Sequence, residues 1–168
     1  TTAASAPLIS DVVTRIGPLG SIGGVASSEI AALGASMVGS GIQSEVAATG
    51  IKNLILAMVS GESATKSQAN AFAQIGLNAT DMASAMQNDA KGAILTVLKA
   101  IEQLAPEKRT AVMADLFGKE SLSAIGPLLS NLSGLESNFA KVGDSTKYAG
   151  SMENEFSTRS QTTANSMQ

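Results

Sequence analysis

The segment Ser63-Ala-Thr-Lys66 has the serine–lysine spacing with which acyl-enzyme hydrolases activate a nucleophile. In that chemistry the lysine takes the serine proton, and Ser-Asp-Asn and Lys-Thr-Gly elements complete the site. Neither element occurs in the 168 residues. We therefore interpret Ser63 and the residues after it as the start of a helix, with no hydrolase site.

Glycine is concentrated between Gly17 and Gly24, in the segment Gly-Pro-Leu-Gly-Ser-Ile-Gly-Gly. A phosphate-binding loop needs Gly-x-Gly-x-x-Gly, or a Lys-Ser/Thr pair that grips phosphate and metal. This run has neither. It predicts a flexible connector rather than a nucleotide site.

Carboxylates are the remaining acid–base candidates, because the chain contains no histidine and no cysteine. Histidine is the side chain best suited to proton transfer near neutral pH and the commonest metal ligand. Glu153 and Glu155 are two residues apart on an expected helix, so they point away from each other. Asp115 and Glu120 are interpreted as surface charges near a helix junction. We predict no catalytic, cofactor-binding or metal-binding residue and no enzyme activity; a hydrolase using carboxylates alone is the enzyme alternative.

Charge and hydropathy exclude two further classes of site. The net charge is −3, and no basic run is longer than Lys108-Arg109. A nucleic-acid surface needs a basic cluster, so we expect no specific nucleic-acid partner. The apolar run at 51–59 is interrupted by Lys52 and Asn53, and is far shorter than the roughly 20 residues of a membrane-spanning helix.

The apolar residues are of an unusual kind, because they make up 44% of the chain while aromatic residues make up only 3%. The core must therefore be built from aliphatic side chains and methionine. Methionine can fill irregular gaps in a core or form an adaptable binding surface, and we favour core filling. The methionines are Met37, Met58, Met82, Met86, Met113, Met152 and Met167.

Apolar spacing is helical nearly everywhere, and there is no convincing period-2 strand. We predict an all-α fold: a multi-helix bundle of short helices with glycine- and proline-containing turns and a longer polar C-terminal helix. Residues 1–24 would form a short helix and a glycine-rich loop, 25–142 a helical core module, and 143–168 a polar helix that continues into a longer protein. Helices are expected at about 6–16, 27–38, 43–60, 65–75, 78–87, 89–104, 106–117, 119–131, 132–142 and from 145 onward.

Local signals set these boundaries. Pro18 should end the first helix, and Pro127 should bend or break the helix at 119–131, because proline removes a backbone donor and crowds the preceding turn. Ser27 or Ser28 should cap the second helix. Gly61 lies where a left-handed helix cap is expected.

Four segments, in this order, resemble the core region of bacteriophage tail tape measure proteins. An Ala-Leu-Gly helix end at 32–34 precedes them, and the tract 124–129 after them is also similar, although its proline departs from the pattern. The resemblance covers roughly residues 8–160. The four segments are Gly50–Glu62, Ala73–Met82, Gly92–Leu98 and Leu116–Glu120.

The resemblance implies a long helical chain in the lumen of a phage tail tube. Such a protein sets tail length, templates tube assembly and is ejected during genome delivery. The implied partners are the tail tube protein, tail assembly chaperones, other tape measure copies and the host membrane at ejection. The implied locations are the virion and, during assembly, the bacterial cytoplasm.

The alternative is a membrane-active or pore-forming helical effector domain. Amphipathic helices would permit that function, but a basic polar face is lacking. If the chain is a tape measure segment, we expect the isolated segment to be globular and marginally stable. We also expect its helical bundle to open when the chain is threaded into a tube.

Overall fold

The computed structural model describes residues 6–141, and all regular secondary structure in this range is helical. The predicted all-α multi-helix bundle is confirmed. The helices are α1 (Ala6–Gly23), α2 (Ser27–Gly39), α3 (Ser44–Met58), α4 (Lys66–Gln74), α5 (Ala79–Glu102), α6 (Pro106–Phe117), α7 (Leu122–Ser130) and a further helix at 132–141. Single-turn 3-10 helices at Gly61–Ser63 and Lys119–Ser121 precede α4 and α7. The expected polar helix after residue 143 lies outside the described residues.

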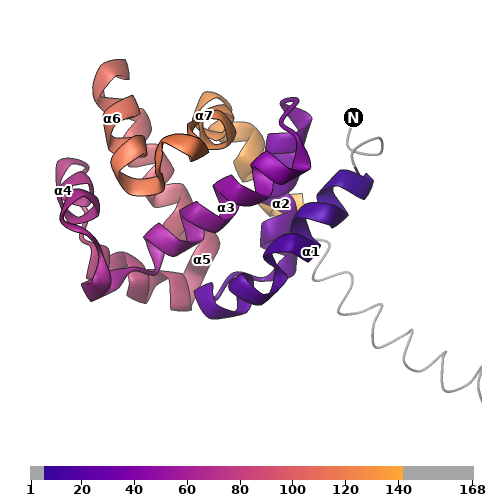
Figure 1. Cartoon of the computed structure of the whole chain (residues 1–168), viewed down its shortest axis with the longest axis horizontal. Coiled ribbons are helices and arrows are strands. Elements are labelled where there is room, and N and C mark those ends of the chain that lie inside the picture. The colour runs from indigo at the N-terminus through magenta and orange to yellow at the C-terminus, as the bar shows by residue number, and fades with distance from the viewer. Residues whose placement is uncertain (1–5, 142–168) are drawn as a thin grey trace, which may run out of the picture.

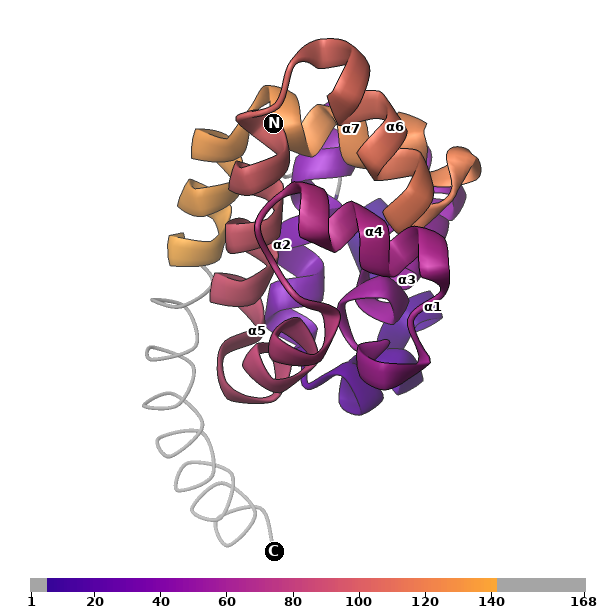
Figure 2. The same ribbon diagram turned by 90° about the vertical axis from the view of Figure 1, so that its left-hand side faces the viewer.

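Helix α3 runs through the middle of the bundle and packs against α1, α2, α5, α6 and α7. Figure 1 shows α1 and α2 on one side of it and α4 and α6 at the opposite end. Figure 2 shows α5 beside the helix at 132–141. An ion pair joins these two helices, with Lys99 Nζ 3.0 Å from Glu136 Oε1.

The core is mainly aliphatic, as the composition predicts, with Phe72, Phe117 and Phe139 also buried in it. In α3 alone, Ile51, Leu54, Ile55 and Met58 are fully buried. Each such side chain stabilises the fold by roughly 1.5–3 kcal/mol relative to exposure. Since these residues recur every three or four positions, one face of α3 is continuous core.

Helix α1 does not end at Pro18, so the predicted loop at 17–24 is wrong. The helix continues to Gly23. Val12 and Ile16 before the proline, and Gly20 and Gly23 after it, are all buried at helical spacing. Burial of this stripe outweighs the backbone hydrogen bond that is lost at the proline. Because this burial depends on tertiary packing, the local sequence around Pro18 does not reveal it.

Helix α7 likewise runs unbroken through Pro127. The predicted break is therefore wrong. Ala124 and Ile125 before the proline, and Leu128 and Leu129 after it, are buried. As in α1, a core-facing stripe on both sides of the proline holds the helix together.

The predicted cap of α2 is also wrong, because Ser27 is already helical and Ala26 is the N-cap. Alanine has no side-chain acceptor for the free N–H groups at the helix start. The Glu29 carboxylate instead accepts a hydrogen bond from the Ala26 N–H, 3.0 Å from Oε1. One half of a capping box thus replaces the expected serine cap.

Glycine corners turn the chain between helices. Gly76 has φ +74°, and the Leu77 N–H donates to Phe72 O at 2.9 Å, which ends α4 in a Schellman motif. Gly41, with φ +92°, makes the same corner after α2. Gly61 also has positive φ, but it opens the 3-10 turn rather than capping α3, which corrects its predicted role.

The predicted division between the helices at 78–87 and 89–104 is present inside α5. Asp89 has non-helical dihedral angles there, φ −156° and ψ 82°. Its Oδ1 accepts the Gly92 N–H at 3.2 Å, which caps the second segment. Asn78 caps the first segment by accepting from the Thr80 and Asp81 N–H groups.

Candidate interaction site

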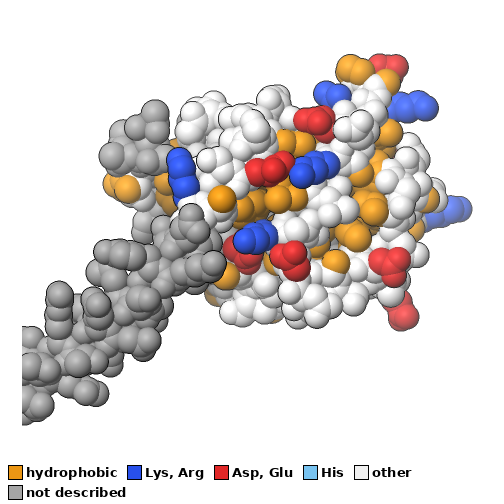
Figure 3. All heavy atoms as spheres, turned by 180° about the vertical axis from the view of Figure 1, so that it is seen from behind, with side chains coloured by type: hydrophobic (Ala, Val, Ile, Leu, Met, Phe, Trp, Pro, Cys, Tyr) orange, Lys and Arg blue, Asp and Glu red, His pale blue; other side chains and the backbone are white. Residues whose placement is uncertain are grey.

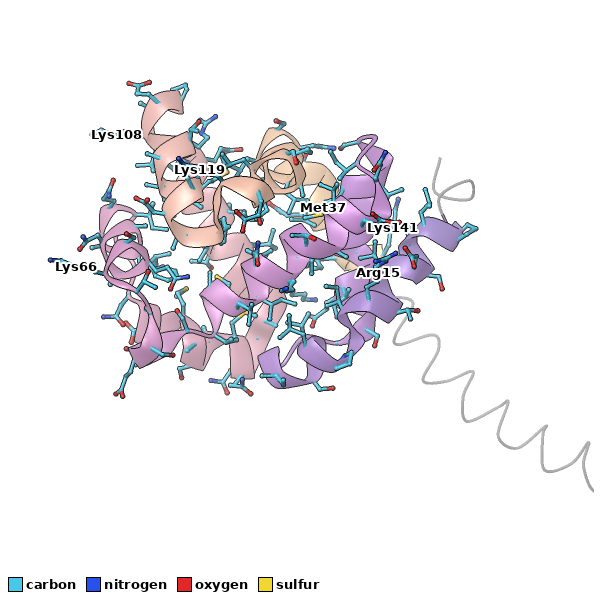
Figure 4. All side chains as sticks on the ribbon, in the orientation of Figure 1. Arg15, Met37, Lys66, Lys108, Lys119 and Lys141 are labelled. Carbon is cyan, nitrogen blue, oxygen red and sulfur yellow. The ribbon has the colours of Figure 1, made fainter. Side chains whose placement is uncertain are left out.

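Ser63 and Lys66 do not form a nucleophilic pair. The Ser63 hydroxyl donates to Ser60 O at 2.7 Å, within the 3-10 turn that precedes α4. Lys66 is exposed, and Figure 4 shows its amine pointing away from the body of the protein. The serine proton is therefore engaged by the backbone rather than by the lysine.

The glycine-rich segment offers no loop to cradle a phosphate. Residues 17–23 are helical, so their N–H groups point along the helix axis. Only Gly24, with φ +73°, leaves the helix. The helical conformation of residues 17–23 therefore contradicts the predicted flexible connector.

Of the two carboxylates near the α6–α7 junction, Glu120 makes a structural contact. Asp115 and Glu120 are exposed, and Glu120 Oε1 accepts from Asn53 Nδ2 at 3.3 Å. The same amide donates to Ser121 Oγ at 2.7 Å, and Ser121 is fully buried. Since a buried hydroxyl needs a partner, this contact joins α3 to the 3-10 turn before α7.

Within residues 6–141, no group of three or more acidic side chains lies close enough together to hold a metal ion. Glu153 and Glu155 lie outside the described residues.

The described methionines fill the core, as predicted. Met37, Met58 and Met86 are fully buried, and Met82 and Met113 nearly so. They do not form an exposed adaptable surface. Met152 and Met167 lie outside the described range.

A charged seam joins α1 to the start of α3. Asp11 Oδ2 accepts hydrogen bonds from Arg15 Nε at 2.9 Å and from the Ser44 hydroxyl at 2.8 Å. Arg15 Nη2 also lies 3.7 Å from Glu45 Oε1, at the start of α3. The hydrogen bond from Arg15, followed by that from Ser44, lowers the pKa of Asp11 below its ordinary value of 3.8. The seam holds the first half of α1 beside the N-terminal end of α3.

Three large apolar side chains are exposed in the described part of the chain. They are Ile22 at 68%, Leu8 at 44% and Leu56 at 44%. Gly23 lies against Ile55 of α3, so Ile22 and Leu56 lie at the same end of the α1–α3 pair. The sequence analysis missed Ile22 because it placed this residue in a loop.

An open apolar groove of about 680 Å³ lies between the first half of α1 and the start of α2. We call it the α1 groove. It is lined by Ala6, Ile9, Ser10, Val13, Ser27, Ser28 and Ala31.

A second hollow of about 620 Å³ lies between α6 and α7. We call it the Arg109 pocket, because Arg109 is the one charged residue in its lining. The other lining residues are apolar side chains of both helices, several serines, a glycine and an asparagine. The sequence analysis missed this pocket because residues far apart in the chain form it. Its lining is Ser40, Arg109, Met113, Leu122, Ser123, Gly126, Pro127, Leu129, Ser130 and Asn131.

The rear face has no patch of a single charge sign. Figure 3 shows lysine or arginine and aspartate or glutamate side chains interspersed over partly apolar surface. Because neither sign gathers on this face, it does not offer the electrostatic footprint that a polyanion needs.

None of the helices in the described range is both long enough and apolar enough to cross a lipid bilayer.

Comparison with known proteins gives two matches. The family described as phage-related minor tail protein matches residues 1–118, a range that spans α1 to α6. A probable tape measure protein of Halomonas phage phiHAP-1 is 36% identical over 144 residues. The match covers 86% of this chain but only 17% of that relative, so the chain spans about a sixth of its length. No solved structure matches.

Proposed function

This chain belongs to the phage-related minor tail protein family, and we propose that it is a helical segment of a tape measure protein. In this role it lies in the tail lumen of the virion and contributes to tail length. It templates polymerisation of the tail tube and leaves the tube during genome delivery. No catalytic step is part of the proposed function.

The observation that carries the proposal is the 36% identity to a probable tape measure protein along 86% of the chain. The family match supports it over the first 118 residues. The proposed partners follow from the role: tail tube subunits, assembly chaperones in the bacterial cytoplasm, further copies of the chain, and the host membrane at ejection.

The helical architecture suits a protein whose extended length sets the tail length, because an α-helix lengthens by about 1.5 Å for each residue. All 168 residues in one straight helix would extend about 250 Å. A compact domain of the described size has a radius of gyration of about 14 Å. We therefore propose that the compact bundle opens when the chain is placed in a tube.

Glycine supplies the corners at which such opening can occur. Every positive φ in the described residues belongs to a glycine, and no other residue type adopts it there. Glycine populates left-handed and helical backbone with similar ease, so each corner can straighten without a Cβ penalty. The corner glycines are Gly24, Gly41, Gly61, Gly76 and Gly118.

The proposal is tested by changing the length of the segment in the genome that encodes it. In-frame deletion of residues 25–142 should shorten the tail. The expected change is about 180 Å if each deleted residue contributes the rise of an α-helix, about 1.5 Å, to the tail length. Duplication of the same residues should lengthen it by a similar amount. Tail lengths are measured by electron microscopy of purified particles.

The duplication keeps every native segment, so it remains informative if the deletion abolishes assembly. Tails of unchanged length in the duplication strain would contradict the ruler role. Tails that lengthen with the insert support it.

A further inference from the structure

The Arg109 pocket holds a positive charge that no described carboxylate neutralises. Arg109 Nη2 donates to Glu102 O at 2.8 Å and Leu104 O at 3.2 Å, at the C-terminal end of α5. Arg109 makes none of the ion pairs formed among residues 6–141. Its Nε is buried and hydrogen-bonds to none of the described residues. The guanidinium charge therefore has no anionic partner among the described residues, and an incoming carboxylate would be attracted to it.

The rest of the lining complements this charge with apolar surface. Met113 comes from α6, and Leu122, Pro127 and Leu129 come from α7. No acidic side chain lines the pocket to repel an anion. The pocket therefore fits a segment that carries a carboxylate next to a large apolar side chain.

We propose that the occupant of the Arg109 pocket is the chain's own segment 152–156, Met-Glu-Asn-Glu-Phe. Glu153 or Glu155 supplies the carboxylate for the Arg109 guanidinium. Met152 and Phe156 supply the apolar side chains for the walls. The pocket volume of about 620 Å³ is large enough for such side chains.

The segment lies within reach of the pocket. Asn131 lines the pocket and directly precedes the helix at 132–141. Ten helical residues rise about 15 Å, so Lys141 is about 15 Å from the pocket along the helix. About 12 residues separate Lys141 from Glu153, and extended chain covers up to about 40 Å over that number. The tether is therefore long enough for segment 152–156 to return to the pocket.

The test uses the whole chain with a spin label on Ser157→Cys, which is a unique thiol because the chain has no cysteine. Methyl NMR signals of Met113, Leu122 and Leu129 report on the pocket. We expect the label to broaden these signals selectively. Reduction of the label should restore them.

Two sets of variants decide whether the broadening comes from the pocket. Gly126 lines the pocket, and a Cβ there would meet nothing within 4 Å, so Gly126→Leu fills the pocket without a backbone clash. Gly17→Leu is the matched control, since Gly17 is also helical with open space around it. We expect loss of the broadening in Gly126→Leu and in the double variant Glu153→Gln, Glu155→Gln, and its persistence in Gly17→Leu.

Arg109 itself is left intact, because its substitution would also release the end of α5. Absence of pocket broadening, or broadening that survives Gly126→Leu, would overturn the proposal. Broadening seen only when labelled and isotope-enriched chains are mixed would assign the pocket to a second copy and would equally overturn it. This test does not depend on the tail assignment, so the two can fail separately.

Discussion

Gly50 in α3 and Ala124 in α7 meet so closely that a Cβ at position 50 would lie 2.6 Å from the Ala124 Cβ. That distance is well inside van der Waals contact, and both neighbours belong to packed helices. The missing side chain of Gly50 therefore sets how closely α7 approaches the central helix. A glycine in a helix interior usually weakens it, and here the close packing explains its presence.

We predict that Gly50→Ala destabilises the fold by about 1–3 kcal/mol, as overpacking of a core does. The matched change Gly126→Ala should stabilise it by up to about 1 kcal/mol, because the new methyl group meets nothing and the helix gains propensity. Urea unfolding followed by circular dichroism measures both. Equal effects of the two substitutions would show that the α3–α7 approach does not depend on Gly50.

Substitution of Pro18 tests the continuation of α1. Pro18 is exposed in the interior of the helix, where proline removes a backbone hydrogen bond. Pro18→Ala should raise the free energy of unfolding by about 1–3 kcal/mol. The control is Pro106→Ala at the first position of α6, where proline is well tolerated, and should change stability little. If residues 17–24 were a loop, Pro18→Ala would not stabilise the protein.

The sequence predicts the helical class and most helix ends, because their signals are local. Gly76 and Asn78 act through their own backbone and side-chain bonds, and Pro106 begins its helix as expected. Pro18 and Pro127 led to wrong helix boundaries. Both lie inside helices that are stabilised by buried residues on either side of the proline. A local pattern cannot show that Gly20 will be buried against Ile30.

The two hollows could not be predicted for a related reason. The Arg109 pocket combines Ser40 after α2 with residues of α6 and α7, and only the packing of these helices brings them together. Arg109 was visible in the sequence only as half of a short basic run. The exposure of Ile22 follows from the length of α1, which the sequence analysis predicted too short.

The seam between α1 and α3 predicts a dependence of stability on pH. The pKa of Asp11 is lowered in the folded protein, so its ionised form favours folding. This contribution is fully present above the ordinary carboxyl pKa of 3.8 and is lost as the pH falls through the lowered value. Asp11→Asn should therefore lower the urea midpoint slightly at pH 6, and the difference from the native chain should vanish toward strongly acid pH.

The control for this seam is Glu62→Gln, which removes an exposed carboxylate that forms no ion pair among the described residues. Its urea midpoint should follow that of the native chain across the same pH range. A difference for Asp11→Asn that persisted at the acid end would mean that the charge of Asp11 is not what stabilises the seam.

Helix α4 should open before the rest of the bundle. It has nine residues, fewer than an isolated helix needs for stability in water. Its buried side chains are Ala71 and Phe72 alone, whereas α3 buries eight residues. We expect amide hydrogen exchange in α4 to be faster than in α3 under native conditions, measured by mass spectrometry or NMR.

The variant Phe72→Ala should accelerate exchange in α4 and cost about 3–5 kcal/mol, because it removes the one large side chain that anchors this helix. Asn70→Ala is the control on the exposed face of α4 and should not accelerate exchange. Exchange of α3 and α4 at one common rate would show that the bundle opens only as a whole. Early opening of α4 would instead be consistent with the proposed opening of the bundle, since the Gly61 and Gly76 corners flank this helix.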